Sequence, residues 1–200
     1  KKDGKVIEYT SGKKLTEDGK YEITFENFDG YKTTYTFIID TAAPEIVLSG
    51  AKDGETVNGD VSTVFEGKGV TAELFRDGKS LGAYVSGTVI AEDGSYKIVV
   101  TDLAQNTTEV EFTVDKIVDF SINVNDKGLS NSVTITANEK VTLVLTRNGE
   151  VMEYKFRDAI IEPAAYTLTI TDRLGNKAEM SFTVVEPLVQ KFEHNFDETP

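Results

Sequence analysis

The sequence repeats one pattern three times, and this repetition restricts the fold more than any other feature. Residues 15–40 align without a gap on residues 90–115, and these align without a gap on residues 160–185. The repeating unit is about 70 to 75 residues long, which is enough for a small domain with its own core. The sequence therefore predicts an array of similar small domains.

Within each copy, apolar and polar residues alternate with a period of two. Tyr21, Ile23 and Phe25 alternate with Glu22 and Thr24, Tyr96 and Ile98 fall in the same register of their copy, and an Asp-Gly or Asn-Gly pair separates many such runs. Alternation of β-branched and aromatic residues predicts half-buried strands, and these pairs favour hairpin turns. The predicted strands of the middle copy span residues 45–49, 61–66, 70–76, 80–85, 88–91, 95–101 and 107–114. Because no segment has a convincing helical period, we expect an all-β chain of short strands.

The repeat also predicts the domain organisation. Residues 1–40 match only the C-terminal half of a unit, residues 41–115 and 116–185 are complete units, and residues 186–200 resemble the start of a further domain or a tail. A half unit leaves a sheet edge and part of a core uncovered. We therefore expect residues 1–40 to be poorly covered or to be completed by something outside this chain.

Composition excludes several classes of protein. The 200 residues carry a formal net charge of −13, with no cysteine and a single histidine, His194. The acidic balance argues against nucleic acid and against an anionic membrane surface, and no apolar run approaches the roughly 20 residues of a membrane helix. Without Cys there is no disulfide framework, and one His excludes a His-rich metal site. The acids lie at turns and exposed strand positions, so we predict no enzyme and no cofactor.

The repeated strings resemble a known family. "EDGSYKIVVTDLAQNTTEVEFTVD" (residues 92–115) and "FIIDTAAPEIVLSG" (residues 37–50) look like tandem bacterial immunoglobulin-like (Ig-like) domains. Residues 163–185 keep the Gly-Asn turn of that pattern, whereas the turn at residues 27–31 departs from it. The resemblance implies tandem Ig-like Greek-key β-sandwiches without disulfides, in a secreted or cell-wall-attached bacterial protein.

Six recurring residues are predicted to be structural. In Ig-type domains a Tyr begins the sixth strand, two residues before a sheet-bridging Cys, and its hydroxyl bonds back to the preceding corner. Here an aliphatic residue, such as Ile98, takes the place of the Cys. The predicted structural set is Tyr21, Tyr96, Tyr166, Ile98, Phe112 and Phe182.

Four acids are weak candidates for calcium. Asp102 and Asp172 open the turns "TDLAQN" and "TDRLGN", and Asp40 and Asp115 end their units. Calcium takes several carboxylate and carbonyl oxygens, whereas each turn supplies one carboxylate. The alternatives are an Asx turn at Asp102 and Asp172, and strand termination before a short linker at Asp40 and Asp115.

Two aromatic residues break the repeat and are candidate contacts. Phe28 and Tyr31 lie in the turn of the first copy, where the other copies have no aromatic residue. The expected partners are a glycan or a host or cell-surface protein, bound through loops by a segment that is monomeric within a longer chain. The sequence thus predicts a non-catalytic stalk or spacer that also contributes to adhesion. The alternative is a carbohydrate-binding or accessory module of a larger secreted glycan-active enzyme.

Overall fold

The computed structural model describes residues 1–187 and divides the chain into two compact units, Lys1–Asp115 and Lys116–Pro200. The described residues contain strands and turns and no helix, so the all-β prediction is confirmed. It follows that nothing in this part of the chain has the length and apolar character of a membrane-crossing helix. The predicted segment 186–200 lies outside the described residues except for its first two positions.

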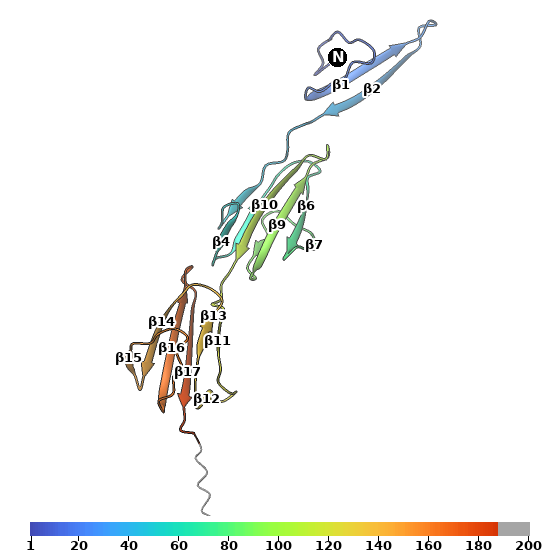
Figure 1. Cartoon of the computed structure of the whole chain (residues 1–200). Coiled ribbons are helices and arrows are strands. Elements are labelled where there is room, and N and C mark those ends of the chain that lie inside the picture. Colours follow the sequence, from blue (N-terminus) through green and yellow to red (C-terminus); the bar gives the residue numbers. More distant parts are fainter. Residues whose placement is uncertain (188–200) are drawn as a thin grey trace, which may run out of the picture. The chain divides into compact units, whose positions relative to one another are not determined.

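The first unit begins with a two-stranded hairpin. β1 (Gly19–Glu26) pairs antiparallel with β2 (Lys32–Ile39) (Figure 1). Tyr21 lies opposite Phe37. Tyr21, Ile23 and Phe25 alternate with Glu22 and Thr24 along β1. Because side chains alternate between the faces of a strand, one face of the hairpin is mostly apolar and the other is mostly polar.

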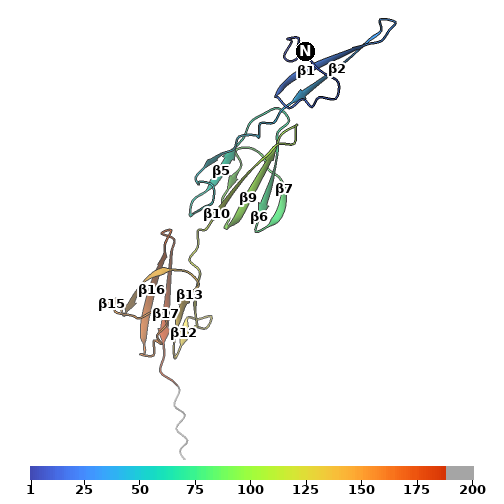
Figure 2. The same cartoon turned by 45° about the horizontal axis from the view of Figure 1, so that its top comes forward.

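Residues 41–115 of the same unit form a two-layer sandwich. One sheet has the order β4–β10–β9–β6–β7 and the other has the order β3–β5–β8 (Figures 1 and 2). The strands are β3 (Val47–Ser49), β4 (Glu55–Val57), β5 (Val61–Val64), β6 (Thr71–Arg76), β7 (Lys79–Ala83), β8 (Val89–Ile90), β9 (Gly94–Thr101) and β10 (Thr107–Val114).

One strand of this sandwich is absent from the sequence prediction. β4 pairs in parallel with β10, so that Glu55 lies opposite Phe112. The sequence predicts no strand in residues 50–60, because a three-residue strand is too short to display an alternating pattern. The chain thus crosses from the three-stranded sheet to the edge of the five-stranded sheet between β3 and β5.

The second unit repeats this architecture. Its five-stranded sheet has the order β12–β17–β16–β14–β15, and a two-stranded sheet pairs β11 with β13 (Figures 1 and 2). The strands are β11 (Phe120–Ile122), β12 (Leu129–Ser130), β13 (Ile135–Ala137), β14 (Val141–Arg147), β15 (Glu150–Met152), β16 (Ala164–Asp172) and β17 (Lys177–Val184). β12 runs parallel to β17, as β4 does to β10.

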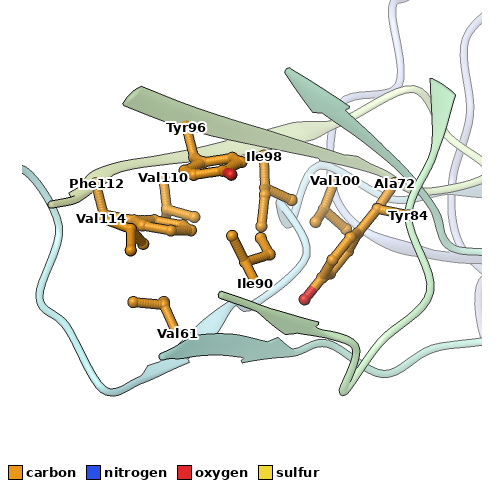
Figure 3. Packing of buried hydrophobic residues seen from close by; sticks show 10 residues of the cluster. All are labelled: Val61, Ala72, Tyr84, Ile90, Tyr96, Ile98, Val100, Val110, Phe112 and Val114. Carbon is orange, nitrogen blue, oxygen red and sulfur yellow. The ribbon is translucent and has the colours of Figure 1, made fainter. Parts of the chain in front are cut away.

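Each sandwich has its own core. Ile98 and Val100 of β9 are fully buried in the first, and Leu168 and Ile170 of β16 occupy the same places in the second. Figure 3 shows Val61 and Ile90 of the three-stranded sheet opposing residues of the five-stranded sheet. In each sandwich two mainly antiparallel sheets pack face to face, and a short strand pairs in parallel at the edge of the larger sheet. This arrangement defines tandem Ig-like sandwiches, as the sequence resemblance implied.

Candidate functional site

The three recurring tyrosines share one environment. Tyr21, Tyr96 and Tyr166 are buried, and each hydroxyl donates to the backbone carbonyl four residues upstream, at 2.8 to 2.9 Å. Each ring stacks on the Phe opposite it, with ring centroids 5.2 to 5.5 Å apart. Those partners are Phe37, Phe112 and Phe182. The hydroxyls are thus used inside the fold.

Burial also changes the acidity of two of these tyrosines. It raises the pKa of Tyr96 and of Tyr166 above the ordinary value of 10.0. A phenol that is neutral, buried and hydrogen-bonded is a poor proton donor at neutral pH. These side chains therefore stabilise the corner of the sandwich rather than offering a reactive group.

The Asp turns are closed by their own side chains. Asp102 Oδ1 accepts from the backbone N–H groups of Ala104 and Asn106, at 2.8 and 2.9 Å, and Asp102 Oδ2 accepts from Asn106 Nδ2. Asp172 makes the same three bonds with the turn it opens. The hydrogen bond from the Asn106 side chain is the main reason why the pKa of Asp102 lies below 3.8.

The turn of the first copy has the same backbone pattern, although its sequence differs. Asn27 Oδ1 accepts from the N–H groups of Asp29 and Tyr31, at 3.1 and 2.9 Å. Asn27 therefore substitutes for Asp102, and Tyr31 stands where the middle copy has Asn106. The departure of this turn from the family pattern is thus confined to its side chains, while the backbone hydrogen bonds are kept.

The three turns share one backbone conformation, and it is strained only in the middle copy. Their fourth residue has a positive φ of 70 to 88°, and it is Gly30 in the first turn, Gln105 in the second and Gly175 in the third. Glycine adopts this conformation freely, whereas a residue with a Cβ is disfavoured there. The middle turn thus keeps its shape at some conformational cost.

The predicted contact residues project from the first turn. Phe28 is fully exposed and Tyr31 is largely exposed, with relative exposures of 110% and 76%. The hydrogen bonds of Asn27 hold the backbone that carries them. Two aromatic rings on a fixed turn can contact a sugar face or an apolar protein surface. That they do so remains a prediction.

The linker after the first hairpin is hydrogen-bonded on both sides, and no pattern in the sequence indicates these bonds. Asp18 Oδ1 accepts from the backbone N–H of Thr41 at 2.9 Å and from its hydroxyl at 2.8 Å. Asn106 Nδ2 donates to the carbonyl of Asp40 at 3.0 Å, and Thr108 Oγ1 donates to the carbonyl of Pro44. We call residues 40–44 the clamped linker.

The two remaining calcium candidates also have local bonds. Asp40 Oδ1 accepts from the backbone N–H of Ala42 at 3.1 Å, and the backbone N–H of Asp115 donates to the carbonyl of Val57 at 2.9 Å. Asp115 is half-buried. Strand termination and linker capping thus account for observed contacts of both residues, and calcium binding there stays untested.

Comparison with known proteins finds a partial sequence similarity to a cell-wall protein. No family model matches it. An outer cell wall protein of Brevibacillus brevis is 46% identical over 77 residues, which are 38% of this chain and 8% of that protein. The chain thus spans a small part of this relative's length.

Three solved structures resemble much of the chain in backbone arrangement. Extracellular domains 3–5 of Drosophila OTK cover 83% of this chain, which spans 69% of that structure, with 13% identity and a TM-score of 0.30. Tandem Ig domains of titin cover 70% of it, and the chain spans 95% of them, with 9% identity and a TM-score of 0.33. The insect immune protein hemolin covers 84%, and the chain spans 56% of it, with 11% identity and a TM-score of 0.39. At such scores these likenesses carry no argument about function.

Proposed function

We propose that this chain is a non-catalytic spacer segment of a bacterial secreted or cell-wall surface protein. A spacer holds a functional part away from a surface, so it needs independent cores and stiff connections. The clamped linker is the observation that carries the proposal, because its backbone is bonded to residues on both sides. The similarity to part of an outer cell wall protein supports the location.

The use of polar groups supports a non-catalytic role. The recurring Tyr hydroxyls bond to backbone carbonyls, and the recurring Asp carboxylates bond to backbone amides. A catalytic acid or base needs a group that is free to exchange a proton with a substrate. Repetition of the same bonds in each copy favours a structural purpose.

Backbone relaxation tests whether the linker is stiff. We expect nitrogen-15 order parameters at residues 40–44 to match those of β9, at about 0.85, whereas a flexible linker gives values below about 0.6. Low values at Thr41 and Ala42 would contradict the spacer proposal. The matched variant Asn106→Ala should lower the order parameters of the linker and leave those of β9 unchanged.

The second candidate function is adhesion through the first turn. The exposure of Phe28 and Tyr31 favours it. A glycan array and purified bacterial cell walls provide the test, with the double variant Phe28→Ser and Tyr31→Ser. Loss of binding in this variant would support adhesion, and Leu103→Ser is the matched control because Leu103 occupies the same turn position in the middle copy.

A further inference from the structure

The outer face of the three-stranded sheet in the middle sandwich carries an apolar strip. Val47 of β3 lies opposite Val64 of β5. Val89 of β8 pairs with Ser62, which shares the outward face of β5 with Val64. These three valines are 54%, 44% and 58% exposed, whereas Thr63, which points inward from β5, is fully buried. Because the valines occupy neighbouring strands, they form one apolar surface on the solvent side of the sheet.

Two glutamates lie at one end of this valine strip. The register of β3 and β5, continued by two residues, places Glu45 opposite Glu66. Both glutamates line a groove of about 310 Å³ together with Val47 and Val64. Both are exposed, and neither carboxylate has a hydrogen bond or an ion pair within the part of the chain that the structure describes. Like charges that lie directly opposite on paired strands are unfavourable, so the groove is suited to a cation.

The second unit has polar, paired residues at the same positions. Asp119 and Asn138 replace the two glutamates, and Asn138 Nδ2 donates to Asp119 Oδ2 at 2.9 Å. Ser121 and Thr136, which lie opposite each other, replace the paired valines, and Ala159 replaces the third valine. The sandwich can therefore form without an apolar and doubly charged surface here. Its presence in one of the two sandwiches favours a role in binding.

A basic side chain matches the chemistry of this groove. The methylene groups of a lysine or arginine can pack on valines while the charged head donates hydrogen bonds to carboxylates. A hard divalent cation matches less well, because it requires several oxygen ligands and the floor of the groove is apolar. The valine strip continues past the groove to Val89 on the third strand. It is thus wider than one basic side chain, and the surface fits a polypeptide better than a free amine.

We propose that this surface binds a segment of another protein in which a lysine or arginine is flanked by branched apolar side chains. The basic head lies between Glu45 and Glu66, and its stem covers the paired valines. A flanking apolar side chain covers Val89. The proposal is independent of the spacer role and of the aromatic turn, because it uses neither the clamped linker nor Phe28.

Peptide titration followed by nuclear magnetic resonance tests the proposal. The probes are two capped peptides, Val-Thr-Lys-Thr-Val and Val-Thr-Arg-Thr-Val, because alternate side chains of an extended segment face one side. We expect saturable shifts of the backbone amides of Val47, Val64 and Val89 in the 200-residue chain. An analogue with uncharged norleucine at its centre keeps the apolar stem and should bind about tenfold more weakly, since it loses both carboxylate contacts.

Variants of the groove identify the residues that bind. Glu66→Asn introduces the residue of the second unit and should weaken peptide binding about threefold, as expected for one exposed ion pair. Glu111→Gln is the matched control, because Glu111 is an exposed acid on β10 of the other sheet and makes no part of the groove. Its affinity for the peptides should be unchanged. Unaltered amide shifts of β9 establish that each variant is folded.

Several results would overturn the proposal. One is the absence of saturable shifts with both basic peptides, and another is equal binding of the norleucine analogue, which would leave only a general apolar attraction. The same amide shifts with calcium chloride alone would assign the groove to a metal ion. Shifts that grow with the concentration of the chain in the absence of peptide would assign the surface to a second copy.

Discussion

The side-chain amide of Asn106 donates a 3.0 Å hydrogen bond to the backbone carbonyl of Asp40, which lies 66 positions earlier in the chain. The same amide donates to the carboxylate of Asp102 at 2.9 Å. One side chain therefore closes the β9–β10 turn and also holds the linker that enters the sandwich. The shape of this turn and the stiffness of the linker are coupled through a single residue.

Replacement of Asn106 should weaken both features. Asn106→Ala removes two hydrogen bonds, so we expect a loss of about 1 to 2 kcal/mol in the free energy of unfolding, measured by urea denaturation. Asn176→Ala is the control, because Asn176 closes the equivalent turn of the second unit. It should destabilise that unit without affecting the order parameters of Thr41. A linker that stays rigid in Asn106→Ala would contradict the coupling.

The core of the middle sandwich contains a buried hydroxyl group whose removal should stabilise the fold. Thr63 is fully buried, and its hydroxyl has no hydrogen-bond partner among the described residues. The second unit has the fully buried Ile135 at this place. Thr63→Val should raise the free energy of unfolding by about 1 kcal/mol, since an unpaired buried hydroxyl is removed. Thr88→Val, at an exposed position, should leave it unchanged in the same denaturation experiment.

The Asp102 turn should make stability depend on pH in one direction. Because the folded pKa of Asp102 lies below 3.8, its contribution is present above that pH and is lost as the pH falls through the folded pKa. The difference in unfolding free energy between the native chain and Asp102→Asn should therefore shrink as the pH falls below 3.8. A difference that stays constant between neutral and acid pH would show that the charge of Asp102 does not contribute.

Calcium should leave the melting temperature unchanged. The Oδ1 atoms of Asp102 and Asp172 each accept two backbone N–H groups, so calcium would have to compete with the bonds that shape these turns. Differential scanning calorimetry in excess calcium and in chelator provides the comparison. A higher melting temperature in calcium that disappears in Asp115→Asn would instead assign that carboxylate as a ligand.

The sequence predicts the regular part of the fold well, because long alternating strands carry their own signal. β9 and β10 have eight residues each, and their predicted bounds differ from the observed ones by at most one residue. The position of Tyr96 before Ile98 indicates the sandwich corner for the same reason, since the two side chains share one face of the strand.

The parts that the sequence does not predict depend on contacts between distant segments. β4 is defined by pairing with residues of β10 that lie 57 positions later in the chain. The bond from Asn106 to Asp40 is equally non-local, and the sequence shows Asn106 only as a turn residue. Asn recurs at residues 106 and 176, but the hydrogen bonds that each Asn makes within its own turn already explain this recurrence. The recurrence therefore does not indicate the bond to Asp40.

The parallel pairing of β4 with β10 affects how the middle sandwich responds to a stretching force. Segments near the start and the end of the middle sandwich lie side by side there, with Glu55, Thr56 and Val57 opposite Phe112, Thr113 and Val114. A tension applied through the two ends of this domain would slide the strands along each other, so their hydrogen bonds would share the force and break together. A hairpin pulled from its open end would lose its bonds one after another. β12 and β17 repeat the arrangement in the second unit. In each sandwich, extension would therefore require the hydrogen bonds between the two parallel strands to be sheared together.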